Sequence, residues 1–127
     1  MKTILVDAVY TFIIVGTGIF KDMHKLLETY ANRKIILTNA NYEKFKEYGI
    51  DKMPYELFTL KHNPEKTDPE YFRILLKHFN LQSKDVIYFE HNIEAIKSAE
   101  SVGIVSYHYD ENKKDLAKLK DFIDKNI

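Results

Sequence analysis

Six polar side chains of this chain have types and positions suited to the chemistry of a phosphoryl or acyl group. They are Asp7, Thr38, Asn39, Lys66, Glu90 and His91. All but the lysine lie just past a short apolar run that predicts a buried strand. In open parallel sheets, ligands bind outside the carboxyl ends of the strands. Two carboxylates, a hydroxyl and an ammonium that meet at such an edge could bind and transfer a phosphoryl or acyl group.

Asp7 is the candidate nucleophile, because a carboxylate oxygen can attack phosphorus or carbon. Carboxylate oxygens are also the ligands that Mg2+ prefers, so Asp7 is equally a candidate metal ligand. The simpler alternative is an aspartate that caps the turn after its strand. The sequence leaves these roles open.

Thr38, Asn39 and Lys66 are the candidate phosphate-binding residues. The hydroxyl and the amide could donate hydrogen bonds to a phosphate, although both residue types also favour the N-cap of a helix. Lys66 is a compact cation that could neutralise phosphate oxygens and the charge of Asp7. Its alternative, in a chain rich in lysine, is a solvated surface residue.

Glu90 and His91 follow the apolar run 85–89. Glu90 is a candidate metal ligand with Asp7, although glutamate places its oxygen about 1.5 Å further out than aspartate would. His91 could act as an acid or base near neutral pH, or bind a softer metal such as Zn2+ together with Glu90. The simpler alternative for His91 is a surface residue at the start of a helix.

The elements that must position these residues alternate along the chain. Runs rich in β-branched residues predict strands, and segments of helical periodicity between them predict βαβ units and a parallel sheet of about five strands. The expected strands are 3–6, 34–37, 55–60, 86–89 and 105–109, and the expected helices are 22–30, 41–48, 68–79, 93–102 and 115–127. The fold class is therefore α/β.

Capping residues and glycines mark the ends of several elements. Asp22, Asn41 and Asp68 are expected N-caps, and Gly49 and Gly103 are expected to end helices. Gly16-Thr17-Gly18 interrupts an apolar segment and predicts a hairpin that turns on glycine. The aromatic residues around this hairpin are expected to form an exposed edge through which a homo-oligomer could form. They are Tyr10, Phe12 and Phe20.

Length and composition limit the class of protein. A chain of 127 residues fits one domain, 1–127, with a real core. The formal net charge of zero gives no general attraction to nucleic acid or anionic membranes. The chain has no cysteine, which excludes disulfides and thiolate catalysis, and no apolar stretch of membrane-spanning length. We expect a cytoplasmic protein whose partner is a small phosphorylated molecule or another protein.

In order and spacing, the motifs of this chain resemble those of the haloacid dehalogenase (HAD) superfamily. The first motif of that family, Asp-x-Asp-x-Thr, is matched by Asp7-Ala8-Val9-Tyr10-Thr11. The resemblance makes Asp7 the nucleophile and places Val9 where the phosphatases have their general acid/base. The second motif is matched by Thr38-Asn39, and the third by Lys66-Thr67-Asp68-Pro69-Glu70. The fourth motif, usually Asp-Asp, reads Glu90-His91-Asn92.

The resemblance implies a Rossmann-like, three-layer α/β/α HAD core with a flap hairpin and no cap domain. It implies catalytic roles for Asp7, Lys66 and His91, phosphate binding by Thr38, Asn39 and Lys66, and Mg2+ as a cofactor on Asp7 and Glu90. The expected activity is phosphomonoester hydrolysis that is weak or lost, because valine can neither donate nor accept a proton. The alternative is a non-catalytic binding or assembly module. Dehalogenation is disfavoured, because the dehalogenases of the family shield their site with a cap domain.

Overall fold

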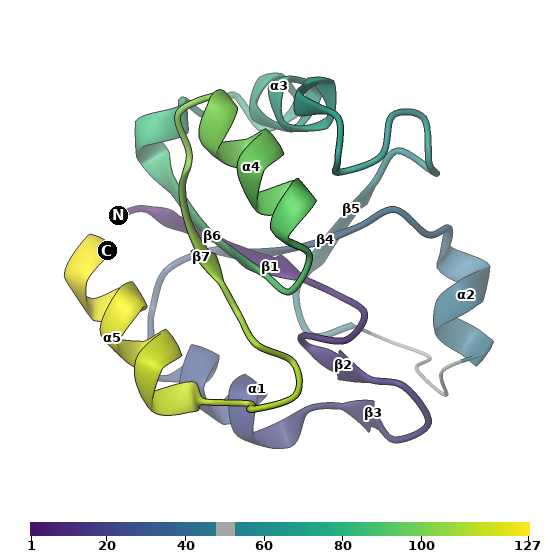
Figure 1. The fold of residues 1–127 in the computed structure, drawn as a ribbon, viewed down its shortest axis with the longest axis vertical. Helices are drawn as coiled ribbons and strands as arrows, with labels where there is room; N and C mark the ends of the chain where they lie inside the picture. Colours follow the sequence, from purple (N-terminus) through teal and green to yellow (C-terminus); the bar gives the residue numbers. More distant parts are fainter. Residues whose placement is uncertain (48–52) are drawn as a thin grey trace.

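The computed structural model describes residues 1–47 and 53–127, which form a three-layer α/β/α fold around a parallel sheet (Figure 1). The sheet has five strands in the order β5-β4-β1-β6-β7, and all four neighbouring pairs are parallel. The strands are β1 (Thr3–Asp7), β4 (Lys34–Thr38), β5 (Glu56–Thr59), β6 (Val86–Glu90) and β7 (Val105–His108). The predicted α/β class and five-stranded sheet are confirmed.

Helices cover both faces of the sheet (Figure 1). One face carries α3 (Pro69–His78) and α4 (Ile93–Ser101), and the other carries α1 (Lys21–Glu28) and α5 (Leu116–Asn126). The short helix α2 (Tyr42–Glu47) follows β4, and one 3-10 turn, Ser83–Asp85, precedes β6. The helix end expected at residues 48 and 49 lies outside the described residues. None of the described helices is long and apolar enough to cross a membrane.

The sheet has a separate apolar core on each face, because successive side chains of a strand point in opposite directions. In β1, Ile4 and Val6 pack into the core beneath α1 and α5, whereas Leu5 packs into the core beneath α3 and α4. Asp7 lies two residues after Leu5, so its side chain points to the same face of the sheet as that of Leu5. The pattern that buries the strand therefore also aims Asp7 toward α3 and α4.

Side-chain caps fix the starts of three helices on the described residues. Asp68 accepts a hydrogen bond from the backbone N–H of Glu70 at 2.9 Å, and Pro69 occupies the first turn of α3. Asn92 and Asp115 cap α4 and α5 in the same way. The expectation for Asp22 was wrong: α1 begins one residue earlier, its N-cap is Phe20, and Asp22 lies in the first turn. An acidic residue there still interacts favourably with the helix dipole.

The expected hairpin after β1 consists of β2 (Ile13–Ile14) and β3 (Gly18–Ile19), which pair antiparallel. Gly16 and Gly18 have φ angles of +87° and +109°, a backbone region that favours glycine. The expected exposed aromatic edge is only partly present. Tyr10 is exposed, but Phe12 is fully buried because it packs against the rings of His24 and Tyr55.

Candidate active site

The parallel pairing of β1 with β6 places two carboxylates next to each other. Val6 pairs with Phe89, so the next residues of the two strands, Asp7 and Glu90, lie side by side at the carboxyl edge of the sheet. Both side chains are buried. Two adjacent buried carboxylates need cationic partners, since an unpaired buried charge is strongly destabilising.

Lys66 supplies the first cation. Its Nζ donates to Oδ1 of Asp7 at 2.5 Å and to Oε1 of Glu90 at 2.6 Å, and the lysine side chain is itself only 7% exposed. The backbone N–H of Lys66 donates to Oδ1 of Asn39 at 2.8 Å, which fixes the segment before α3 against the end of β4. Asn39, at the end of β4, thus positions Lys66, whose ammonium bridges the carboxylates at the ends of β1 and β6.

His91 supplies the second cation. Its Nδ1 lies 2.5 Å from Oδ2 of Asp7 and 3.1 Å from Oε2 of Glu90. The ring also contacts Tyr10 edge-on, with centroids 5.5 Å apart. The carbonyl oxygen of His91 accepts a hydrogen bond from Nε2 of His108 at 2.8 Å, which holds its backbone in place.

The ion pairs shift the pKa values of Asp7, Lys66 and His91 toward their charged forms. Burial alone would raise the pKa of Asp7, but the Lys66 ammonium and the hydrogen bond from His91 bring it well below its usual range. Burial would lower the pKa of Lys66, but the charges of Asp7 and Glu90 raise it above its usual value. Burial would also lower the pKa of His91, but the hydrogen bonds to Asp7 and Glu90 raise it to about 10. Lys66 and His91 are therefore both cations at neutral pH.

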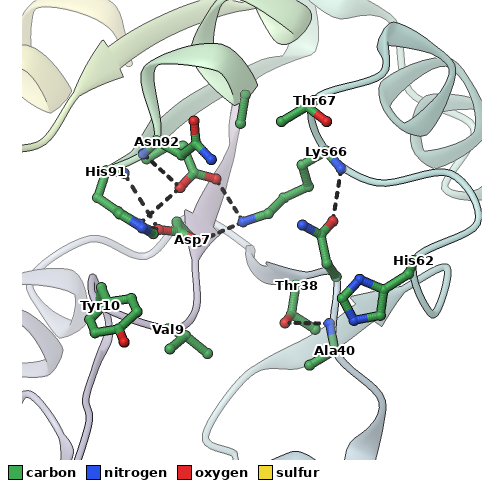
Figure 2. Close-up of a pocket in the computed structure, with 13 residues that line it drawn as sticks. Asp7, Val9, Tyr10, Thr38, Ala40, His62, Lys66, Thr67, His91 and Asn92 are labelled. Atoms are coloured by element: carbon green, nitrogen blue, oxygen red, sulfur yellow. Dashed lines mark hydrogen bonds and ion pairs between the residues drawn. The ribbon is translucent and has the colours of Figure 1, made fainter.

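A pocket of about 260 Å³ opens above these charges. Figure 2 shows His91 and Tyr10 on one side of it and Thr38, Ala40 and His62 on the other. All six residues selected from the sequence line this pocket, together with Val9. The structure therefore brings the whole predicted set together, while the chemical role of each residue stays a prediction.

Thr38 and Asn39 each make a hydrogen bond within the protein as well as lining the pocket. The Thr38 hydroxyl accepts a hydrogen bond from the backbone N–H of Ala40 at 3.1 Å, ahead of α2, which begins at Tyr42, so Thr38 does not take the N-cap position considered as its alternative role. The hydroxyl proton of Thr38 and the amide N–H groups of Asn39 are still able to donate to a ligand. The local role and the ligand-binding role are thus compatible.

Further groups that hold the carboxylates were not predicted as site residues, although Thr11 belongs to the first motif. The hydroxyl of Tyr88 donates to Oε1 of Glu90, and the Thr11 hydroxyl donates to Oδ2 of Asp7 at 2.6 Å. The backbone N–H of Asn92 donates to Oε2 of Glu90 at 3.1 Å. Tyr88 could have been found from the alternation of strand side chains, because it precedes Glu90 by two positions and so shares its face.

Comparisons with known proteins bear on the fold. No family model matches the sequence, and a search of the curated proteins finds no match. An aspartate-to-alanine mutant of a HAD family enzyme from Bacteroides thetaiotaomicron, in complex with magnesium and inorganic phosphate, has a TM-score of 0.70 at 12% identity over 85% of this chain and 93% of its own. A HAD-superfamily hydrolase of subfamily IA from Geobacter sulfurreducens has a TM-score of 0.60 at 11% identity over 91% of this chain and 99% of its own.

An uncharacterized protein from Corynebacterium glutamicum has a TM-score of 0.64 at 15% identity over 98% of this chain and 96% of its own. These likenesses span most of each chain. The chain therefore has the HAD-like fold that the order of its motifs predicted.

The side chains at this edge include the donors of a possible metal site. One oxygen each of Asp7 and Glu90 and a ring nitrogen of His91 lie within 4.8 Å of one another. However, all four carboxylate oxygens already accept hydrogen bonds or ion pairs: Oδ1 and Oε1 from Lys66, and Oδ2 and Oε2 from Nδ1 of His91. In this arrangement the residues do not fit Mg2+, which requires oxygen ligands that face the ion.

Proposed function

We propose that the pocket binds a phosphoryl group and that the chain is a HAD-like phosphomonoester hydrolase whose turnover is weak or lost. The observation that carries the proposal is the meeting of Asp7, Lys66 and Glu90, from three separate segments, through ion pairs of 2.5 and 2.6 Å at the carboxyl edge of the sheet. Thr38 and Asn39 line the same pocket. A nucleophilic carboxylate beside a cation and hydrogen-bond donors suits phosphoryl transfer.

The proposed reaction has two steps centred on Asp7. A carboxylate oxygen of Asp7 attacks phosphorus, the bond from phosphorus to the ester oxygen breaks, and the leaving alkoxide takes a proton from solvent water. A second water then attacks phosphorus and gives a proton to solvent, the bond from phosphorus to the Asp7 oxygen breaks, and inorganic phosphate and the free carboxylate are released. Lys66 and Thr38 would hold the phosphoryl oxygens during both steps, through an ammonium charge and a hydroxyl donor.

Proton transfer is the weak point of this site. Val9 lines the pocket where the resemblance places the general acid/base, and a valine side chain carries no proton to transfer. His91 is the nearest substitute, but its pKa of about 10 makes it a poor proton donor at neutral pH. General acid/base catalysis contributes about 10²–10⁴-fold to such reactions, so slow or absent turnover is the expected result.

The Mg2+ cofactor implied by the resemblance stays a prediction. A structural neighbour was crystallised with magnesium and inorganic phosphate, and the resemblance assigns such an ion to Asp7 and Glu90, whose arrangement here does not fit it. Bound Mg2+ would neutralise phosphate charge. No step above is assigned to the metal, because His91 and Lys66 occupy the oxygens that it would need.

A non-catalytic binding module is the second candidate. The observation that favours it is the mutual neutralisation of four charges, with Asp7 and Glu90 balanced by Lys66 and His91. A carboxylate oxygen that already accepts two hydrogen bonds, as Oδ2 of Asp7 does, is a weakened nucleophile. The pocket would then bind a ligand or a protein segment without turnover.

Turnover of p-nitrophenyl phosphate by the wild type, Asp7→Asn and Val9→Asp distinguishes the two candidates. If the site is a disabled hydrolase, Val9→Asp restores a proton donor and raises the rate by about tenfold or more. Asp7→Asn then abolishes whatever rate remains, and the double variant is inactive. An inactive Val9→Asp variant that keeps the native fold would contradict the hydrolase and leave the binding module.

A further inference from the structure

The two cations of the site bridge the carboxylates in parallel. Lys66 joins Oδ1 of Asp7 to Oε1 of Glu90, and Nδ1 of His91 joins Oδ2 of Asp7 to Oε2 of Glu90. Each carboxylate therefore uses one oxygen for each cation. The bridge made by His91 occupies Oδ2 of Asp7 and Oε2 of Glu90, the oxygens that a divalent cation would otherwise bind.

We infer that the imidazole of His91, which lies between Oδ2 of Asp7 and Oε2 of Glu90, takes the place of a divalent cation, so that this pocket binds phosphate or a phosphomonoester without a metal. The nature of the ligand rests on the proposed function. The absence of a metal requirement rests on the positions of Asp7, Glu90, Lys66 and His91 alone.

Charge balance supports this inference. Two carboxylates carry a charge of −2 and the two cations carry +2, so the buried group is neutral without any ion. A divalent cation would have to displace His91 or bring two further charges into a buried site. Either change is costly, because a charge without a partner in the interior is strongly destabilising.

Geometry supports it as well. Mg2+ binds oxygens at about 2.0–2.1 Å and tolerates little deviation from octahedral geometry. Nδ1 of His91 lies 2.5 Å from Oδ2 of Asp7, on the side of the carboxylate that faces Glu90. An ion could reach that side only if the ring turned away, which would break both contacts and the packing against Tyr10.

Hydrogen-bond donors remain for an anionic ligand. Among the described residues, Nε2 of His91 has no hydrogen-bond partner, and the ring lines the pocket. Lys66 uses two of its three ammonium hydrogens on the carboxylates. With the Thr38 hydroxyl, these groups could bind the oxygens of a phosphate dianion.

A titration of the isotope-labelled protein with Mg2+ alone, followed by backbone amide NMR, tests the metal claim. We expect no saturable shifts at Asp7, Glu90 and His91 up to millimolar Mg2+ in the wild type, and none with Zn2+. His91→Asp should gain Mg2+ binding by about tenfold or more, since a third carboxylate replaces the cation. The matched control is His62→Asn, which changes a pocket histidine that does not contact Asp7 or Glu90 and should leave the wild-type result unchanged.

Saturable shifts at Asp7 and Glu90 in the wild type with either of these metals would overturn the inference. This test needs no variant, so it remains decisive even if His91→Asp does not fold.

Calorimetric titration with inorganic phosphate, with EDTA or with Mg2+, tests the ligand claim. Equal affinity in the two buffers supports the inference, and His91→Gln should weaken binding in EDTA about tenfold by removing a charge-assisted hydrogen bond. Binding that requires Mg2+ would overturn it. Absence of binding in both buffers would refute the proposed function and the phosphate part of the inference, while the Mg2+ titration would still decide the metal part.

Discussion

At the scale of single residues, the charged side chains of the site form ion pairs with one another. Asp7 and Glu90 are each bound by both Lys66 and His91, and Thr11 and Tyr88 add hydrogen bonds from hydroxyl groups. Buried ion pairs of this kind add little net stability compared with apolar packing, but losing one partner is costly. Each member of the set is therefore expected to affect stability as well as ligand binding.

Lys66→Met should destabilise the fold because it leaves two buried carboxylates with only one cation. We expect a loss of about 3–5 kcal/mol in the free energy of unfolding, measured by urea denaturation. Lys97→Met is the matched control, because that lysine is exposed and pairs with Glu94 at 3.4 Å on the surface of α4, where such a pair contributes little. Equal stabilities for the two variants would contradict the buried network.

His91 should make stability fall as the pH rises. Its pKa is raised from 6.5 to about 10 in the folded state, so the stabilisation it provides is complete below pH 6.5 and is lost as the pH approaches about 10. We expect the difference in unfolding free energy between the wild type and His91→Gln to shrink steadily over this range. A difference independent of pH would mean that folding does not shift the pKa of His91, which would contradict its ion pairs with Asp7 and Glu90.

Five of the six pocket residues could be selected from the sequence because each lies at the end of an apolar run, where strand ends converge, whereas Lys66 was selected from the resemblance of its segment to the third motif. Their mutual contacts were not predictable. Whether His91 points at Asp7 or at solvent depends on a side-chain rotamer that the chain order does not fix. The N-cap role considered for Thr38 and Asn39 is not what these hydrogen bonds show: Thr38 accepts from Ala40 and Asn39 accepts from Lys66, while both residues line the pocket.

At the scale of elements, strand alternation explains both the core and the site. Asp7 lies on the same face of β1 as Leu5, and Glu90 lies on the same face of β6 as Tyr88. The apolar runs therefore predicted the strands to within a residue or two. Helix starts were harder, because an acidic residue near the first turn can either cap the helix or interact with its dipole.

Asp68 and Asp22 illustrate this difference and give a matched pair of variants. Asp68→Ala removes the side-chain cap of α3, so it should cost about 1 kcal/mol of unfolding free energy. Asp22→Ala should cost less, because Asp22 makes no cap hydrogen bond and contributes only through the dipole of α1. Thermal or urea denaturation of both variants measures the difference, and an equal or larger loss for Asp22→Ala would show that the cap assignment of α1 is wrong.

At the scale of the whole molecule, two helical layers enclose the sheet and leave its carboxyl edge accessible. Lys66 reaches the site from the loop before α3, His91 from the start of α4, and Thr38 from the end of β4. The parallel sheet with helices on both faces was predictable as a class from the alternation of strands and helices along the chain, whereas the order of the strands was not. The details of the pocket were not, since they depend on loops whose conformation the sequence pattern does not specify.

The central claim is that this edge of the molecule is a phosphate-binding pocket that needs no divalent cation. The most direct test is a crystal structure grown with tungstate, a heavy-atom analogue of phosphate, in the absence of divalent metals. We expect anomalous density in the pocket within hydrogen-bond distance of Nζ of Lys66 and the Thr38 hydroxyl. A pocket that stays empty at saturating tungstate, or that fills only when Mg2+ is added, would contradict the account.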